Sequence, residues 1–181
     1  MSGGLAEHVA LAEQLHGLLP AVDDAARAVV EAYARGGRVY TFGNGGSSTD
    51  AAHFAEELVG RFVRERRALP AQSLSVDAST LTCIANDYSY DEVFERQVRA
   101  FVRDGDVVIG FSTSGRSPNV VRGLAAAREL DATTVLFAGG SGGEAEIVLA
   151  VPSESTARIQ EMHVLLLHVI LEEVDRWAAS A

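Results

Sequence analysis

Two short apolar segments each run directly into a polar loop, and this pattern constrains the fold more than any other feature of the chain. Residues 38–42 (RVYTF) lead into the glycine-rich loop 43–48, and residues 106–111 (DVVIGF) lead into the serine-rich loop 112–117. A helical pattern follows each loop. Strands that alternate with helices predict a doubly wound α/β domain, in which helices cover both faces of a parallel sheet. Ligands of such domains bind beyond the carboxyl ends of the strands, where both loops lie.

The remaining elements complete this alternation. Further strands are predicted at 71–76, 133–138 and 147–151, and helices at 5–19, 21–35, 49–63, 79–86, 91–103, 120–130 and 157–178. Pro20 separates the first two helices, and Pro118 suits the first turn of another. We therefore expect one domain over residues 1–181, with an N-terminal helical segment over 1–36 and an α/β core with a long C-terminal helix over 37–181. That last helix is apolar nearly all round from Ile159 to Ile170, which is typical of a buried helix and here suggests burial between subunits.

The 181-residue chain contains fifteen arginines and no lysine. The lack of lysine excludes Schiff-base chemistry, pyridoxal phosphate anchoring and the P-loop lysine, so a bound phosphate would need backbone N–H groups, hydroxyls or arginine. With 25 acidic residues the formal net charge is −10, which argues against a nucleic-acid surface. Four arginines form the only basic run, which we expect to be a solvated patch: Arg61, Arg64, Arg66 and Arg67.

The chain gives no signal for a membrane or for an oxidising compartment. Its longest strongly apolar run, residues 164–171, is much shorter than the ~20 residues that span a bilayer. A single cysteine, Cys83, cannot form an internal disulfide, and the N-terminus lacks the basic flank and apolar stretch of a secretion signal. We expect a cytoplasmic protein that binds neither membrane nor nucleic acid.

The two loops differ in how strongly they indicate a ligand. The serine loop offers four hydroxyl groups beside a helix N-terminus, whose free N–H groups favour an anion such as phosphate: Ser112, Thr113, Ser114 and Ser117. Helix capping alone is the alternative explanation, although one cap needs only one hydroxyl. The glycine loop has two equal interpretations, a tight turn or a close approach of backbone to ligand. It does not match the dinucleotide-binding fingerprint, which would need glycine where Ser48 stands.

Two helices contain further polar residues that could act together. His53 and Glu57 lie four residues apart, hence on one helix face, where they could share a metal or a proton-transfer task or form an ordinary exposed pair. Gln160, His163 and His168 lie on the apolar C-terminal helix. Gln160 and His168 are about two turns apart along this helix and ~80° apart around it, so they can line one cavity.

Four segments together resemble the sugar isomerase (SIS) fold family, and within it the phosphoheptose isomerases: GNGGSSTDAAHFAEELVGRF (43–62), LTCIANDYSYDEVF (81–94), GDVVIGFSTSGRSPNVV (105–121) and RIQEMHVLLLH (158–168). The resemblance spans nearly the whole chain and implies a flavodoxin-like, five-stranded parallel sheet flanked by helices. It also implies aldose–ketose isomerisation between sedoheptulose 7-phosphate and D-glycero-D-manno-heptose 7-phosphate, by proton transfer through an enediol. Members of the family are typically homotetramers with sites at subunit boundaries.

The resemblance further implies roles for individual residues. Glu57 and His168 would be the catalytic acid–base pair. A zinc ion would be held by His53, Glu57, Gln160 and His168. The phosphosugar would be held by Asn44, Gly45, Gly46, Glu57, Asn86, Asp87, Ser112, Thr113, Ser114, Ser117 and Gln160.

The chain departs from the family pattern in two places. Arg116 stands where the family commonly has asparagine. Between Gly143 and Ile147 the chain is several residues shorter than family members, which predicts the loss of a short helix after the fourth strand. No expected catalytic residue lies in that segment.

Two alternatives to this function stay open. The chain also resembles the DnaA initiator-associating proteins, SIS-fold relatives that bind the replication initiator, across residues 67–80, 91–101 and 157–163. Those binding proteins lack the catalytic pair at the positions of Glu57 and His168, and the presence of both residues here favours the enzyme. A SIS isomerase of another phosphosugar is the second alternative, because a phosphate loop does not report the length of the carbon chain.

Overall fold

The computed structural model describes residues 3–180 and contains a five-stranded sheet. Its strands stand in the spatial order β2-β1-β3-β4-β5, with the bounds β1 (Val39–Gly43), β2 (Ala71–Ser73), β3 (Val107–Ser112), β4 (Thr133–Ala138) and β5 (Ile147–Ala150). Every neighbouring pair is parallel. This is the flavodoxin-like order, whose switch point lies between β1 and β3. The predicted fold class is confirmed, and the glycine and serine loops follow the carboxyl ends of these two strands.

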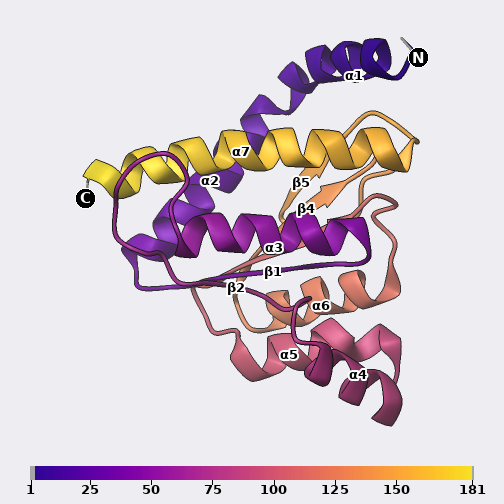
Figure 1. Ribbon diagram of the computed structural model, residues 1–181. Coiled ribbons are helices and arrows are strands. Elements are labelled where there is room, and N and C mark those ends of the chain that lie inside the picture. Colours follow the sequence, from indigo (N-terminus) through magenta and orange to yellow (C-terminus); the bar gives the residue numbers. More distant parts are fainter. Residues whose placement is uncertain (1–2, 181) are drawn as a thin grey trace.

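Helices cover both faces of the sheet (Figure 1). One side has α1 (Gly3–Gln14), the short 3-10 helix η1 (Leu15–Leu18), α2 (Leu19–Ala34), α3 (Gly46–Val59) and α7 (Thr156–Ser180). The other side has α4 (Ala78–Asp87), the 3-10 turn η2 (Tyr90–Glu92), α5 (Val93–Phe101) and α6 (Pro118–Glu129). Successive residues of β3 point to opposite faces of the sheet: Ile109 and Phe111 pack against the first group of helices, and Val108 packs against the second.

Helices α3 and α7 run side by side on one face of the sheet (Figure 1). Each buries an apolar stripe at helical spacing; in α3 the ring of Phe54 lies edge-on to Phe137 of β4, with 6.5 Å between centroids. Leu165 of helix α7 is 39% exposed in the single chain. Among the described residues, no helix has both the length and the apolarity to cross a membrane.

Some predicted boundaries are wrong by a few residues. Pro20 does not separate two helices but lies in the first turn of α2, where its missing N–H costs no hydrogen bond. Helix α3 begins at Gly46 instead of residue 49 and ends at Val59, because the backbone turns at Gly60. Residues 139–146, all of which the structure describes, form no helix, as the shortened segment predicted.

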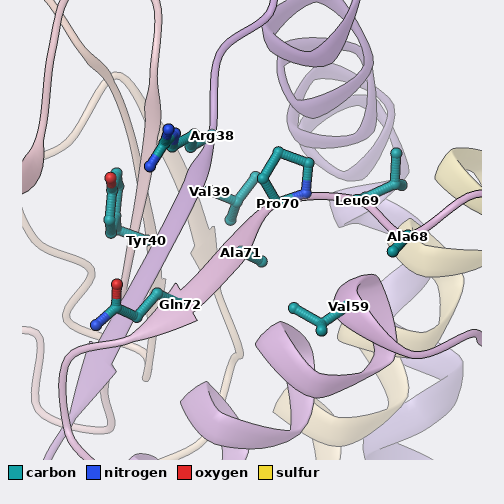
Figure 2. A pocket seen from close by; sticks show the side chains of 9 residues that line it. All are labelled: Arg38, Val39, Tyr40, Val59, Ala68, Leu69, Pro70, Ala71 and Gln72. Atoms are coloured by element: carbon teal, nitrogen blue, oxygen red, sulfur yellow. The ribbon is translucent and has the colours of Figure 1, made fainter.

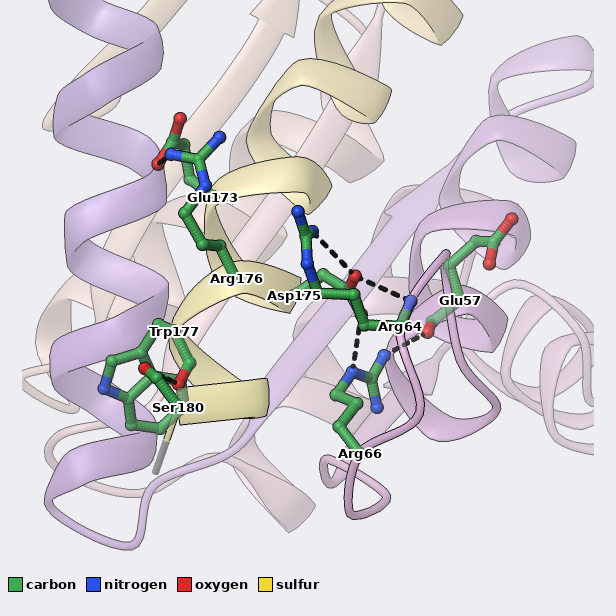
Figure 3. A network of polar contacts seen from close by, with 8 residues as sticks. All are labelled: Glu57, Arg64, Arg66, Glu173, Asp175, Arg176, Trp177 and Ser180. Atoms are coloured by element: carbon green, nitrogen blue, oxygen red, sulfur yellow. Dashed lines mark hydrogen bonds and ion pairs between the residues drawn. The ribbon is translucent and has the colours of Figure 1, made fainter.

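The arginine run is not a uniformly solvated patch. The side chain of Arg66 is 1% exposed and pairs with Asp175 of α7, whose carboxylate is equally buried (Figure 3). Arg64 pairs with the same carboxylate from a side chain that is 45% exposed. Two ion pairs therefore hold the segment between α3 and β2 against α7.

A cavity of about 290 Å³ opens at the amino ends of β1 and β2 (Figure 2). Apolar side chains line one side of it, among them Val39, Val59 and Leu69. Arg38, Tyr40 and Gln72 lie on the other side. This cavity lies at the amino ends of the strands, whereas the two polar loops follow the carboxyl ends, so the cavity is separate from these loops.

Candidate active site

Three titratable side chains from α3 and α7 meet where the two helices pack together. His53 and Glu57 lie one turn apart on α3, and their Nε2 and Oε1 atoms are 3.4 Å apart. His168 of α7 brings its Nε2 atom to 3.5 Å from Nε2 of His53. One donor atom from each of the three residues can be chosen so that all lie within 4.8 Å of one another. The predicted catalytic pair, Glu57 and His168, and one further predicted metal ligand, His53, are thus brought together.

These side chains are partly buried, and burial changes the pKa of His168. The side chains of His53 and Glu57 are 32% and 19% exposed, and the ring of Phe62 lies 5.5 Å from that of His168. Burial lowers the pKa of His168, and the neighbouring His53 lowers it further, while Glu57 and Glu172 oppose the change. His168 is therefore held neutral near pH 7, as a group that exchanges protons must be to accept one.

Asp50, one turn before His53 on α3, adds a second unusual carboxyl group. Burial raises the pKa of Asp50 to about 6, although the nearby His53 opposes this increase. Its Oδ2 atom has no hydrogen-bond partner among residues 3–180. Spacing along the helix could have suggested this residue, but in the predicted helix, which starts at residue 49, Asp50 falls in the first turn, where an aspartate ordinarily indicates a cap.

The glycine loop leads from β1 into α3 through a sharp turn at Gly45, whose φ is +55°. Asn44 is held in this turn by a reciprocal amide pair with Asn119 of α6, both hydrogen bonds being 2.8 Å long. The hydroxyl of Tyr90 donates to Asn44 Oδ1 at 3.0 Å. The predicted ligand Asn44 is thus fixed by groups from two other elements.

The serine loop is held together by its own hydroxyl groups. Ser112 Oγ lies 3.0 Å from Ser117 Oγ and 3.4 Å from Ser114 Oγ. Gly115 makes the turn with a φ of +64°, and α6 begins directly after Ser117, with Pro118 in its first turn. A cavity of about 210 Å³ opens beside the loop and is lined by Thr113, Ser114, Arg116, Gly140, Ser141, Ser153, Glu154, Thr156 and Ile159. Thr113 and Ser114 of the loop thus face this cavity together with the charged side chains of Arg116 and Glu154.

Gln160 of α7 packs against the glycine loop at the start of α3. Its side-chain amide packs so closely on Gly46 that a methyl group there would overlap the amide nitrogen. Gln160 therefore lies where α3 begins, and His168 lies about two turns further along α7, as their spacing predicted.

Two predicted substrate ligands are less closely tied to this group. Asn86 and Asp87 end α4 as exposed residues, and the Asn86 amide donates to the Asp87 carboxylate at 2.8 Å. Tyr90, in the next turn of the chain, connects this region to Asn44. The segment that ends α4 and the glycine loop thus lie at the same end of the sheet.

His163 belongs to the core and not to the candidate site. It is fully buried, its Nε2 atom lies 3.1 Å from the carbonyl oxygen of Ala138, and the rings of Phe111 and Phe137 pack edge-on against it. Burial lowers the pKa of His163 to about 4, although the bond to Ala138 opposes the change. His163 is therefore a neutral residue of the core near pH 7.

Residues 6–139 match the family described as SIS domain. A phosphoheptose isomerase of Geobacter sp. (strain M21) is 51% identical over 163 residues, covering 88% of this chain and 85% of the relative. The corresponding protein of Helicobacter pylori is 45% identical over 176 residues and covers 95% of this chain and 92% of the relative.

Solved structures agree with these relatives. The phosphoheptose isomerase GmhA of Neisseria gonorrhoeae superposes with a TM-score of 0.89 at 37% identity, over 97% of this chain and 96% of the other. That of Francisella tularensis gives 0.92 at 32% identity with the same coverage. The chain therefore belongs to the SIS domain family and, within it, to the phosphoheptose isomerases.

Proposed function

We propose that this chain interconverts sedoheptulose 7-phosphate and D-glycero-D-manno-heptose 7-phosphate. The observation that supports this most strongly is the convergence of one carboxylate, Glu57, with one imidazole, His168, in a partly buried site between two helices. Aldose–ketose isomerisation needs two such groups, because a proton must leave one carbon and a proton must arrive at the next. The relatives named phosphoheptose isomerase support the choice of a heptose phosphate.

In this mechanism the ketose phosphate is held by its phosphate at the serine loop and by its hydroxyls at the glycine loop. The hydroxyls of Ser112, Ser114 and Ser117 and the N–H groups that begin α6 suit a phosphate dianion without any lysine. Asn44 and the backbone of Gly45 and Gly46 suit the sugar hydroxyls. The remaining proposed substrate ligands are Glu57, Asn86, Asp87, Thr113 and Gln160.

Proton transfer then follows in two balanced steps. Glu57 removes the proton from C1 of the ketose, the C–H electron pair becomes the C1–C2 double bond, and the carbonyl oxygen on C2 takes a proton from solvent, giving the enediol. The imidazole of His168 then takes the O1 proton as the C1 carbonyl forms, and the electron pair of the C1–C2 double bond takes this proton from the imidazolium at C2. His168 serves at the second carbon, and the reverse assignment of the two residues gives the same product. Such catalysis contributes ~10²–10⁴-fold.

A zinc ion fits the donor set. The nitrogen and oxygen donors of His53, Glu57 and His168 lie within 4.8 Å of one another and are of the types that zinc prefers. Gln160 is the fourth proposed ligand, through its side-chain amide oxygen. When bound, zinc would polarise the carbonyl and hydroxyl oxygens of the sugar.

The metal assignment has a direct test. Protein purified without chelators should contain about one zinc per chain by elemental analysis, and a His53→Gln variant should contain much less, because one of the donor atoms is lost. Wild-type protein that stays fully active at negligible zinc content would remove the metal from the mechanism.

A homotetramer in the cytoplasm is the proposed setting. Its support is the exposure in the single chain of three apolar side chains from α3, the segment after it and α7: Val59, Val63 and Leu165. One free, exposed cysteine, Cys83, is compatible with a reducing compartment. Sedimentation equilibrium tests the tetramer, and a monomer at micromolar concentration would contradict it.

The catalytic pair is tested by Glu57→Gln and His168→Gln variants, with Glu56→Gln as the matched control. Glu56 lies next to Glu57 on α3 but is exposed and outside the three-residue group. We expect kcat to fall ~10²–10⁴-fold in the first two variants and to stay near wild type in the control. Full activity in both catalytic variants would refute the mechanism. Stoichiometric binding of the replication initiator in a pull-down, without isomerase activity, would instead favour the binding-protein alternative.

A further inference from the structure

We propose that Arg66 and Asp175 are positioning residues for the catalytic pair, because together they clamp the last turn of α3 to α7. This inference rests on the proposed function. Glu57 lies in that last turn, and His168 lies on α7. The distance between the two reacting side chains is therefore the distance between two helices, which local sequence alone does not fix.

The guanidinium of Arg66 binds the carbonyl groups that end α3. Its Nη2 atom donates to the carbonyl oxygen of Glu57 at 2.7 Å, and its Nη1 atom donates to that of Leu58 at 3.0 Å and to that of Gly60 at 3.4 Å. A helix leaves its last four carbonyls without partners inside the helix, and the negative end of its dipole favours a cation. Arg66 supplies both partner and charge at the residue proposed as the base.

The other side of the same guanidinium binds α7. Its Nε atom donates to Asp175 Oδ1 at 3.1 Å, while the backbone N–H of Arg64 donates to Asp175 Oδ2 at 3.0 Å (Figure 3). Asp175 lies seven residues after His168, close to two full turns, so the two side chains leave nearly the same face of α7. The clamp and the imidazole thus share one helix face.

Burial makes this arrangement specific. The side chains of Arg66 and Asp175 are each 1% exposed, and every nitrogen of the guanidinium donates at least one hydrogen bond. A buried ion pair is useful mainly when its geometry is fixed and its hydrogen bonds are all made. Lysine could replace the charge but not the planar fork that reaches two helices at once.

The test uses Arg66→Lys and Asp175→Asn, with Arg64→Met as the matched control. The side chain of Arg64 contacts the same carboxylate at 3.3 Å, but it is 45% exposed and has no hydrogen bond to an α3 carbonyl. Its backbone N–H survives the change. The control thus removes an ion pair with Asp175 while leaving the link between the helices.

We expect kcat to fall on the order of 10–100-fold in Arg66→Lys and Asp175→Asn, since a misplacement of about 1 Å can cost 10²-fold. KM should stay within about twofold, because the proposed ligands of the phosphate and of the sugar hydroxyls on the serine and glycine loops do not contact Arg66 or Asp175. The imidazole NMR signals of His53 and His168 should shift in both variants and stay in place in Arg64→Met. Both variants must melt cooperatively above the assay temperature, and Asp175→Asn, the near-isosteric change, decides the matter if Arg66→Lys does not fold.

Two results would overturn the inference: folded variants whose kcat stays within about twofold of wild type, or imidazole signals that do not move. Failure of the proposed function looks different. Wild-type protein would then convert no heptose phosphate, and the imidazole signals would still report whether the clamp positions these side chains.

Discussion

Replacing Gly46 by alanine should lower the activity of the enzyme while leaving its stability almost unchanged. A methyl group at Gly46 would overlap the amide nitrogen of Gln160 and lie 3.0 Å from its Cδ and 3.1 Å from its Oε1. Ordinary contact between such atoms needs ~3.5–4.0 Å, so the amide nitrogen, which is the closest atom, must withdraw by more than about 1 Å. The displaced group is the end of a flexible side chain, and the backbone can stay in place.

The stability terms nearly cancel. Gly46 lies in the first turn of α3 without a positive φ, so alanine is sterically allowed there. Alanine stabilises such a position by about 0.4–1 kcal/mol through the unfolded chain, and an off-rotamer Gln160 costs about 0.5–1.5 kcal/mol. The net change should stay within about 1 kcal/mol, or about 2–4 °C in melting temperature for a domain of this size.

Activity should change much more. If the Gln160 amide contacts the reacting sugar or the metal, losing one such interaction costs about 1.4 kcal/mol, and kcat/KM falls about tenfold. The matched control is Gly43→Ala, whose methyl group would lie 2.6 Å from the carbonyl oxygen of Ser47 and 2.9 Å from that of Phe111. Both obstacles are backbone, so this variant should lose about 1–3 kcal/mol of stability.

Steady-state kinetics and thermal melting of Gly46→Ala, Gln160→Ala and the double variant test this reasoning. Because the alanine acts through Gln160, the change at Gly46 should cost no further activity once Gln160 is gone. A Gly46→Ala enzyme with wild-type kcat/KM would refute the placement of Gln160 in the active site.

Further predictions concern the serine loop and the core histidine. Gly115→Ala should lower the free energy of unfolding by more than about 2 kcal/mol in chemical denaturation, because the left-handed backbone costs a side chain about 1–2 kcal/mol and the methyl group would also overlap the carbonyl of Gly142. Gly142→Ala is the control: its φ is equally positive but the space around it is open, so it should lose only the ~1–2 kcal/mol of the backbone conformation. Equal losses in the two variants would contradict this explanation. The pKa of His163 is about 4 in the folded chain and about 6.5 in the unfolded chain, so the unfolded state binds more protons between these two pH values. The free energy of unfolding should therefore fall as the pH drops from 6.5 to 4, by up to roughly 3 kcal/mol. Urea denaturation should show a flatter pH dependence for His163→Gln; the opposing contribution of Asp50, whose pKa is raised, is common to both proteins, and identical curves would contradict the burial argument.

The fold was predictable because its signals are local and repeat along the chain. Strand β4 matches its predicted range, 133–138, because an apolar run bounded by Asp131 and glycines has few alternatives. The start of α3 was less predictable, since glycine and serine usually indicate a loop. Here Ser47 N–H donates to the Asn44 carbonyl at 3.0 Å, and the first turn forms on the loop itself.

The site was predictable only where one segment contains the signal. His53 and Glu57 share a helix face, and their spacing suffices to place them together. Asn119 was missed because an asparagine after a proline at a helix start suggests a cap, and its true partner, Asn44, lies 75 residues away. Arg66 was misassigned for the same reason, because its buried partner Asp175 is 109 residues further along the chain.

The central claim is tested most directly by incubating the purified wild-type chain with sedoheptulose 7-phosphate and following the sugar phosphates by NMR. The proposed mechanism predicts that D-glycero-D-manno-heptose 7-phosphate accumulates to equilibrium, and that smaller ketose phosphates offered in parallel react much more slowly. Folded protein that leaves sedoheptulose 7-phosphate unchanged, or that isomerises a different ketose phosphate faster, would contradict it.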